Sequence, residues 1–315
     1  MPVLYSTLVY IKCLIYIAIG DFTISNLYMQ IYNRKTNMII DAHTHIFTSR
    51  MKQDRSVYFK NEPEFSLLYD SPKAAICTID DLILSMDRHQ VDTSVVCGFP
   101  WRTPDTIKKN NDAVIEAVIK NPGRIKGLAC FDAAWDGAAD ETLRCIDAGL
   151  SGAGELAFYL SGIDETALGY LTPVMAVLKE TGLPCMIHTN EPVGHKYPGK
   201  TPITLEQIYA LAKAFPDNKI ILAHWGGGIF FYNVMKKEVR DVLKNIWYDT
   251  AASMFLYSPQ IYDMAVVAGL ADKILFGTDY PLLPPDRYYK DMDASGMTPE
   301  QKAMVLGKNA HALFR

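Results

Sequence analysis

The chain has no Cys-x-x-Cys pair, and its six cysteines are scattered through 315 residues. This spacing argues against a zinc ribbon and against a disulfide framework. Cys97, Cys130 and Cys185 lie in apolar, strand-like runs. We therefore expect them to be small buried hydrophobic residues of a cytoplasmic protein, because the cytoplasm keeps thiols reduced.

An excess of charge and a long hydrophobic run are also lacking. The 31 Lys and Arg and the 35 Asp and Glu give a net charge of −4, without the positive field of a nucleic-acid-binding protein. The apolar run 13–20 follows Lys12 and is too short to span a bilayer, and no clear small-residue cleavage site follows it. We expect no nucleic-acid partner and no stable membrane association; a membrane anchor near the start is the alternative.

Residues 1–37 differ in composition from the remainder. They begin apolar and rich in Tyr, Ile and Leu, and residues 21–37 are mostly polar. We expect residues 1–37 to be an N-terminal extension or the product of an over-called translation start, and residues 38–315 to form the domain.

From Met38 onward, apolar strand-like runs alternate with amphipathic segments, and an apolar content of 49% allows a large core. The expected strands are the run ending at Ile40, then 93–98, 125–130, 153–156, 184–187, 220–223, 246–248 and 274–277. The expected helices are 78–89, 110–120, 138–148, 173–181, 205–215, 232–243, 259–267, 299–306 and 310–314, with a polar insertion at 47–73.

Eight strands alternating with helices predict a distorted (β/α)8 TIM barrel. A doubly wound open sheet is the alternative. That fold normally has a Gly-rich turn after its first strand, whereas here the turn reads His-Thr-His-Ile-Phe.

Chemically functional residues recur where the expected strands end. His43 and His45 lie two apart, so they project to the same side of the first strand. The other members, in chain order, are Glu155, His188, His224 and Asp279. Functional groups of a TIM barrel sit at this end of the strands, and imidazole with carboxylate forms a ligand shell suited to Zn²⁺ and other divalent metals. Each residue alone is also typical of a turn or a helix cap.

This order of residues resembles the amidohydrolase superfamily of metal-dependent barrel enzymes. Within it, the chain is similar to the amidohydrolase-related branch, which also contains decarboxylases. The resemblance covers about residues 38–315. It includes the phrases Asn-Pro-Gly-Arg-Ile-Lys-Gly-Leu, Ile-Leu-Phe-Gly-Thr-Asp-Tyr-Pro and Leu-Gly-Lys-Asn-Ala.

The resemblance implies roles for the strand-end residues. The implied ligands of a divalent metal, with Zn²⁺ expected, are His43, His45, His188 and Asp279. Asp279 is either a ligand or the general base that takes a proton from metal-activated water.

His224 and Glu155 are the residues on which the number of ions depends. His224 is either a ligand of a second metal or a group that polarises the reacting oxygen of the substrate. Glu155 either bridges two ions or only orients a ligand. One ion or two therefore remain open.

The long loop 189–200 leaves the same rim. Its candidate substrate-binding residues are Glu191, His195, Lys196, Tyr197 and Lys200, whose cations could hold an anionic substrate. The alternative is a solvated loop stiffened by prolines. Trp101, Arg102 and Trp225 are further rim candidates.

The resemblance implies two reactions that share these ligands. The first is hydrolysis of an amide, ester or lactone of a small molecule by metal-activated water. The alternative is non-oxidative decarboxylation of a small carboxylic acid. A non-enzymatic scaffold is the third reading, and retention of every expected ligand argues against it. A homo-oligomer is compatible with all three.

Overall fold

Eight short parallel strands form the centre of the molecule in the computed structural model, which describes residues 38–314. The expectations for residues 1–37 lie outside this range. The strands are β1 (Ile40–His45), β2 (Thr93–Cys97), β3 (Ile125–Gly127), β4 (Ala153–Leu156), β5 (Cys185–Ile187), β6 (Ile220–Leu222), β7 (Ile246–Asp249) and β8 (Ile274–Leu275).

The strands pair in chain order and close into a barrel. Continuous pairing gives one sheet of β1, β2 and β3 and another of β4 to β8. An isolated bridge from Ala129 to Ala153 joins β3 to β4. On the other side, Ala42 N donates to Phe276 O over 2.7 Å, which joins β1 to the segment after β8. The predicted TIM barrel is therefore confirmed. Its strand pairing is interrupted at two places, between β3 and β4 and between β8 and β1.

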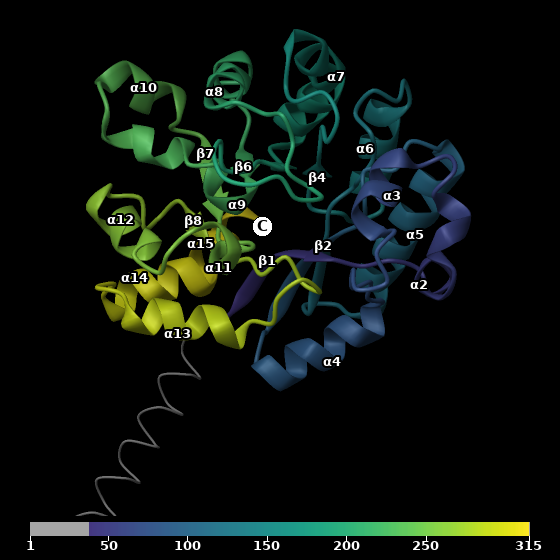
Figure 1. Cartoon of the computed structure of the whole chain (residues 1–315), viewed down its shortest axis with the longest axis horizontal. Helices are drawn as coiled ribbons and strands as arrows, with labels where there is room; N and C mark the ends of the chain where they lie inside the picture. The colour runs from purple at the N-terminus through teal and green to yellow at the C-terminus, as the bar shows by residue number, and fades with distance from the viewer. Residues whose placement is uncertain (1–37, 315) are drawn as a thin grey trace, which may run out of the picture. The chain divides into compact units, whose positions relative to one another are not determined.

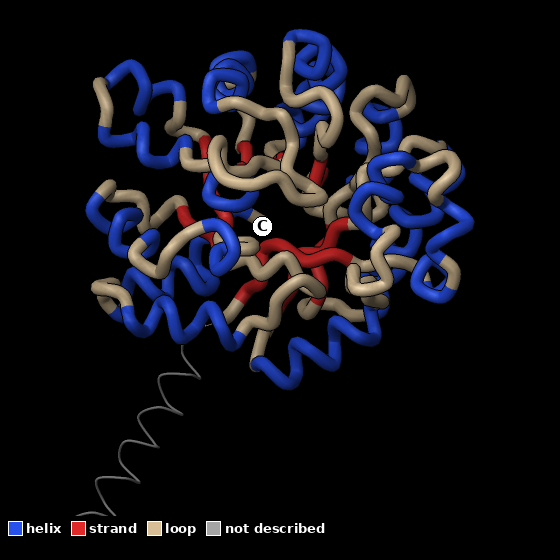
Figure 2. Tube along the Cα trace, viewed as in Figure 1, coloured by secondary structure: helices blue, strands red, loops and turns tan. Residues whose placement is uncertain are grey.

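Helices enclose the strands on the outside (Figures 1 and 2). The helices between β1 and β4 are α2 (Ser49–Gln53), η1 (Arg55–Tyr58), α3 (Pro63–Tyr69), α4 (Ile79–His89), α5 (Pro104–Lys120) and α6 (Ala138–Asp147). Those between β4 and β8 are α7 (Glu165–Thr181), α8 (Leu205–Ala214), α9 (Ala223–Gly226), η2 (Ile229–Val234), α10 (Lys237–Val242), α11 (Ser253–Leu256) and α12 (Ile261–Val267). After β8 come α13 (Asp286–Ala294), α14 (Pro299–Ala303), the π-helical η3 (Met304–Lys308) and α15 (Asn309–Leu313).

Local sequence explains several helix boundaries. Thr78 and Asp81 form the expected capping box of α4, where Asp81 Oδ2 accepts a hydrogen bond from Thr78 N over 2.7 Å. The prediction that a helix begins at Pro173 is wrong. α7 begins at Glu165, because the side chain of Asp164 caps it by accepting from Ala167 N over 2.9 Å.

Two other expectations about helices are also wrong. The single helix predicted over 232–243 is two, because Met235 has an extended backbone between η2 and α10. The two helices predicted at the end of the described chain are continuous, because η3 connects α14 to α15. The insertion 47–73, for which no helix was predicted, contains the three short helices α2, η1 and α3.

The barrel interior holds its own apolar core. It combines inward side chains of the strands with Ala310, Leu313 and Phe314 at the end of the chain, which cover the base of the barrel. The five described cysteines are all buried and free, as expected of hydrophobic residues. The helices found in residues 38–314 are all too short or too polar to span a bilayer. The opposite end of the barrel, at the carboxyl ends of the strands, contains buried polar residues.

Candidate metal centre

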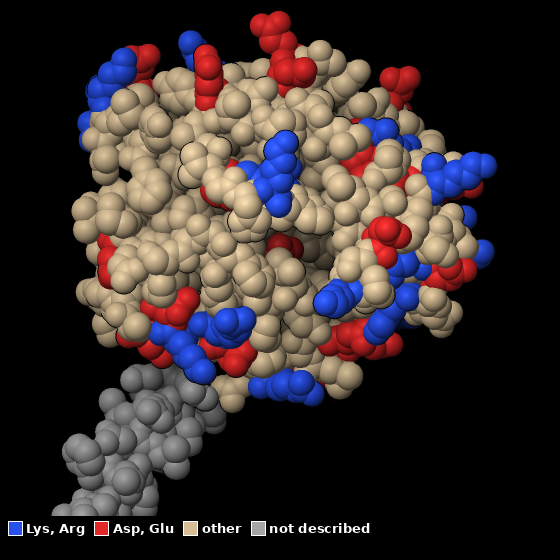
Figure 3. Space-filling model, viewed as in Figure 1, with Lys and Arg blue, Asp and Glu red and all other residues tan. Residues whose placement is uncertain are grey.

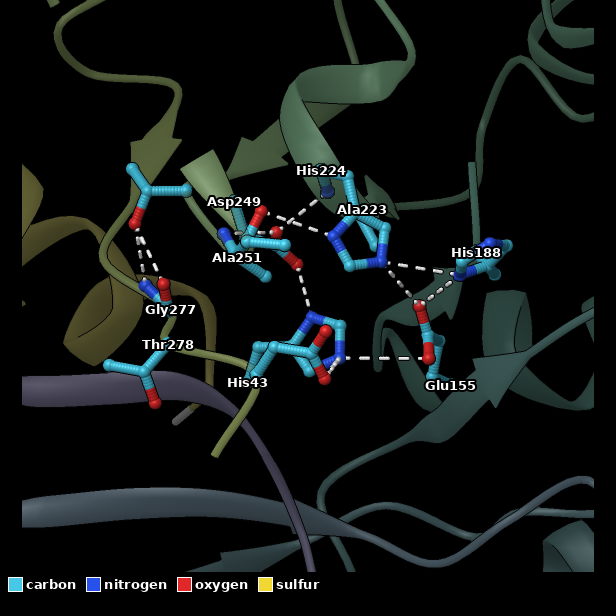
Figure 4. Close-up of polar contacts among 12 residues, drawn as sticks. His43, Glu155, His188, Ala223, His224, Asp249, Ala251, Gly277 and Thr278 are labelled. Carbon is cyan, nitrogen blue, oxygen red and sulfur yellow. Dashed lines mark hydrogen bonds and ion pairs between the residues drawn. The ribbon is translucent and has the colours of Figure 1, made fainter. Parts of the chain in front are cut away.

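All six predicted metal ligands meet at the carboxyl end of the barrel strands, and Figure 4 shows His43, Glu155, His188 and His224 pointing toward one another. His43 and His45 come from β1 and Glu155 from β4. The other three directly follow strands or lie close after them. They are His188 after β5, His224 after β6 and Asp279 after β8.

The two imidazoles that come from β1 face each other. His43 Nε2 and His45 Nε2 are 3.1 Å apart, and each lies 3.6 Å from Glu155 Oε2. Asp279 Oδ1 lies 3.3 Å from His45 Nε2 and 3.8 Å from His43 Nε2. Four potential ligand atoms therefore surround one small volume.

The other oxygen of Glu155 faces a second set of nitrogens. Glu155 Oε1 lies 3.0 Å from His188 Nδ1 and 3.4 Å from His224 Nε2. Those two nitrogens are 3.2 Å apart. The carboxylate thus stands between two pairs of imidazoles, with one oxygen toward each pair.

Each imidazole uses its outer nitrogen to donate a hydrogen bond to the protein, because every outer partner is a carboxylate or a carbonyl oxygen. The outer pairs are His43 Nδ1 with Asp249 Oδ2 (2.8 Å), His45 Nδ1 with Gly98 O (2.9 Å), His188 Nε2 with Gly199 O (2.9 Å) and His224 Nδ1 with Ala251 O (3.1 Å). A neutral imidazole carries a single N–H, so all four inner nitrogens present lone pairs.

The inner face of the cluster consequently contains acceptors alone: four imidazole nitrogens and the oxygens of Glu155 and Asp279. Acceptors at such distances repel unless a proton or a metal ion lies between them. Fixing the outer N–H is also how proteins orient the histidine ligands of a metal. The donor set therefore fits a divalent cation.

The pKa shifts within the cluster also favour the binding of a cation. Burial lowers the pKa of His43, but the charges of Asp249 and Glu155 outweigh burial and hold that pKa well above its usual value. Burial raises the pKa of Glu155, but the charges of His43 and His188 hold it well below its usual value. The site therefore attracts positive charge, which protons supply when no metal does.

Asp249 is a member of the site that sequence reasoning missed. It ends β7, is fully buried, and accepts from His43 Nδ1, from His224 N over 2.8 Å and from Ala251 N over 3.0 Å. One carboxylate thus orients two of the histidines. Its position after Ile246-Trp247-Tyr248, at the end of an expected strand, was the available signal.

Strained backbone places two of the predicted residues. His224 and Asp279 have φ angles of 57° and 61°, a region that costs a residue with a Cβ about 1–3 kcal/mol. His224 N is held by Asp249, and Asp279 N donates to His43 O over 2.9 Å. Gly227 then lets the chain pass close to the loop after β5, since a Cβ there would lie 2.4 Å from Asn190 O.

A cavity of about 600 Å³ opens above the cluster. Figure 3 shows the hollow on this face, bordered mainly by uncharged residues and with acidic atoms at its bottom. Its walls include Tyr69, Phe99 and Tyr159. The rings of Phe99 and Tyr159 are parallel within 8°, with their centroids 6.0 Å apart. The centroids of the Tyr159 and His188 rings are 5.2 Å apart. Aromatic surface therefore leads down to the histidines.

The predicted substrate-binding loop reaches this cavity with only part of its side chains. Glu191, His195 and Tyr197 line the cavity, whereas Lys196 and Lys200 are not among the lining residues. Lys200 Nζ instead donates to Glu191 Oε1 over 2.6 Å and to Val193 O over 2.7 Å. Lys196 is exposed to solvent.

The three other rim candidates lie outside the cavity wall. Trp101 is fully buried and donates to Asn110 Oδ1 over 2.7 Å. Trp225 is also buried and donates to Ser253 Oγ over 2.7 Å. Arg102 faces a neighbouring cavity and pairs with Glu64 and Asp132. Their sequence position next to strand ends did not reveal that packing turns them away.

Comparison with known proteins places this architecture among enzymes. A family model described as Amidohydrolase matches residues 40–315. Gamma-resorcylate decarboxylase of Rhodococcus jostii (strain RHA1) is 23% identical over 301 residues, which cover 78% of this chain and 91% of that protein.

Two solved structures share the fold. 5-Carboxyvanillate decarboxylase from Sphingomonas paucimobilis is 18% identical with a TM-score of 0.69, covering 88% of this chain and 99% of that chain. A dihydroxybenzoic acid decarboxylase from a Polaromonas species, with bound manganese and the inhibitor 2-nitroresorcinol, is 20% identical with a TM-score of 0.64, covering 88% and 97%.

Proposed function

The chain belongs to the amidohydrolase family, and from that premise we propose that it is a metal-dependent decarboxylase of a small aromatic carboxylic acid. The observation that carries this proposal is a cavity with aromatic walls above a floor of histidines and carboxylates. None of the described residues lining the cavity is a lysine or an arginine. A substrate carboxylate therefore finds no lysine or arginine on the described walls and would be held by a metal at the floor.

The residues that would hold the metal are the six at the floor: His43, His45, Glu155, His188, His224 and Asp279. When bound there, a divalent ion supplies the positive charge that anchors a substrate carboxylate and withdraws electron density from it. The Polaromonas decarboxylase contains manganese, so Mn²⁺ stands beside the expected Zn²⁺ as a candidate. Imidazole and carboxylate together suit both ions.

The aromatic walls orient the ring of the substrate. The parallel rings of Phe99 and Tyr159 offer a flat apolar surface, which favours stacking of a planar molecule. Tyr159 in turn contacts the ring of His188. A ring that lies along this surface would place its carboxylate at the floor.

Asp279 is the residue we assign to proton transfer. It lines the cavity, and its side chain is 19% exposed, the most of the acidic groups at the floor. Burial raises its pKa, but the hydrogen bond to His45 and the charges of His43 and His224 bring the pKa below its usual value. It is therefore a carboxylate at rest and must first take up a proton.

The reaction needs one proton and no oxidant. The bond between the ring carbon and the carboxylate carbon breaks, and its electron pair stays on the ring carbon. That carbon then receives the proton from Asp279 as carbon dioxide leaves. Asp279 regains a proton from solvent or from a hydroxyl group of the next substrate.

Hydrolysis, the first expectation from the sequence, becomes the second candidate because the relatives named above are decarboxylases. One observation favours it. The two oxygens of Glu155 face two separate pairs of imidazoles, an arrangement suited to two ions that would hold both attacking water and leaving group. Decarboxylation needs no such bridge.

The test uses enzyme stripped with a chelator and reloaded with Mn²⁺ or Zn²⁺. We expect it to release carbon dioxide from 2-hydroxybenzoic acids only when a metal is present, and to leave aryl esters and lactones intact. Metal-dependent cleavage of an ester or lactone without carbon dioxide release, with two metal equivalents per chain, would instead establish the hydrolase.

A further inference from the structure

We propose that the enzyme selects aromatic acids with a single carboxylate and rejects those that carry a second carboxylate on the ring. This inference rests on the proposed function and specifies its substrate class. It follows from where the charges of the outer cavity lie and from which of them are already paired.

Much of the outer lining of the cavity is apolar. Leu68, Val193, Phe255 and Leu282 line it, and the last three have exposed fractions of 74%, 63% and 51%. The acidic residues of the described lining are Glu155 and Asp279 at the floor, and Glu191 of the loop after β5. An anionic group that points outward from the floor would therefore meet mainly hydrocarbon and the carboxylate of Glu191, with His195 as the one basic side chain among the described lining residues outside the floor.

Lys200, a cation close to this wall, is neutralised. Lys200 is bonded to Glu191 and to the carbonyl of Val193, and its side chain is only 11% exposed. Glu191 is held in turn by Tyr197, whose hydroxyl donates to Glu191 Oε2 over 2.8 Å. The ammonium group of Lys200 lies close to the cavity, since a Cβ on the lining residue Gly194 would lie 3.8 Å from Lys200 Nζ.

A second carboxylate would thus lose part of its water without gaining a lysine or arginine partner, which is costly for an ionised group. A neutral substituent of equal size meets no such penalty. The same geometry identifies Glu191 as the specificity-determining residue, because its charge is what keeps Lys200 from serving a second anion.

The experiment compares three ligands of the metal-loaded full chain. They are 2-hydroxybenzoate, 4-hydroxyisophthalate, and the methyl ester of 4-hydroxyisophthalate in which the carboxylate remote from the hydroxyl is masked. The ester matches the dicarboxylate in shape but not in charge. Binding is measured by calorimetry and turnover by carbon dioxide release, so selectivity is observed even where turnover fails.

We expect the two monocarboxylates to bind within a few-fold of each other and the dicarboxylate to bind about 100-fold more weakly. Glu191→Gln should free Lys200 and reduce the difference in affinity between the dicarboxylate and its ester about tenfold. Glu180→Gln, which removes the same charge from an exposed site on α7, should leave that difference unchanged.

The outcomes separate the two claims. Equal binding of the dicarboxylate and its ester overturns the selectivity, whatever the turnover. Selective binding without carbon dioxide release from any of the three, under Mn²⁺ or Zn²⁺, supports the selectivity and contradicts the proposed decarboxylation. If neither monocarboxylate binds, both claims are wrong.

Discussion

The floor of the cavity and its rim differ in almost every physical respect. At the floor, His43, Glu155 and His224 are at most 5% exposed, and their positions are fixed by strands and hydrogen bonds. At the rim, Val193 and Phe255 are more than 60% exposed and belong to a loop and a one-turn helix. The floor is therefore held in place by the barrel, whereas the rim is formed by exposed side chains outside it.

Because of this division, the type of reaction and the choice of substrate depend on different residues. The floor alone suits both hydrolysis and decarboxylation, since both need a divalent ion and a proton carrier. The proposal of an aromatic acid anchored at the floor rests on walls that are partly aromatic and hold no lysine or arginine among the described lining residues. Substitutions at the floor should consequently affect metal and rate, and substitutions at the rim should affect binding.

Removal of a floor histidine should have the largest effect. We expect His45→Ala to lower kcat/KM by about 1,000-fold or more, because a ligand of the metal is lost. Metal content measured by plasma mass spectrometry should fall with it, while circular dichroism shows a folded protein. His311→Ala, an exposed histidine of α15, is the control and should retain both metal and activity. Full metal content in His45→Ala would refute the assignment.

Substitution of the buried carboxylate behind the histidines should have the next largest effect. In Asp249→Asn, one side-chain atom becomes a donor and faces either the N–H of His43 or the backbone N–H groups of His224 and Ala251. We expect metal affinity to fall about 10–100-fold, as is typical when the group that orients a histidine ligand is lost.

Competitive chelator titration measures this loss of affinity. Asp272→Asn, at an exposed site, is the matched control. Unchanged affinity in Asp249→Asn would show that the orientation of His43 does not depend on this carboxylate.

The floor should also give the metal-free protein an unusual pH dependence. The folded-state pKa values of His43 and His45 are raised well above 6.5. Groups whose pKa is raised by folding stabilise the protein below their unfolded pKa, and that stabilisation is lost as pH rises through the folded pKa. The Tm of metal-free protein should therefore fall as pH rises above about 6.5, in accord with the unfolded pKa of histidine.

Bound metal takes the place of those protons, so the metal-loaded Tm should change less over the same pH range. The difference in Tm between loaded and metal-free protein should widen with pH, as scanning calorimetry measures. A difference that stays constant from pH 6 to pH 9 would contradict this description of the floor.

A rim substitution should have the smallest effect. Phe255→Ala removes an apolar contact that is partly exposed, so KM should rise about tenfold or less while kcat changes less than about twofold. Metal content should not change. Val267→Ala, at an exposed site of α12, controls for loss of surface hydrocarbon. A large drop in kcat for Phe255→Ala would break the division between floor and rim.

The same division sets what could be predicted from the sequence. The strand at 153–156 and the residues at the strand ends were predictable because apolar runs and their polar termini are local patterns. The structure brings those six residues together, and their roles as ligands stay a prediction. Asp249 was missed because its partners His43 and His224 lie 206 and 25 residues away.

The rim was less predictable because it depends on pairing within loops and on packing. The pattern of loop 189–200 did not show that Glu191 neutralises Lys200. Likewise, Trp101 is held among aromatic residues of the insertion 47–73, such as Phe65, whose helices were not anticipated. Contacts between segments far apart in sequence decide which rim residues face the cavity.

The most direct test follows the atoms of the product. Metal-loaded enzyme is incubated with a 2-hydroxybenzoic acid in deuterium oxide enriched in ¹⁸O, and the organic product is analysed by mass spectrometry. Decarboxylation predicts one deuterium on the carbon that carried the carboxylate and no ¹⁸O in the phenol. A product that retains its carboxylate, or one that gains ¹⁸O from metal-activated water, would contradict the account.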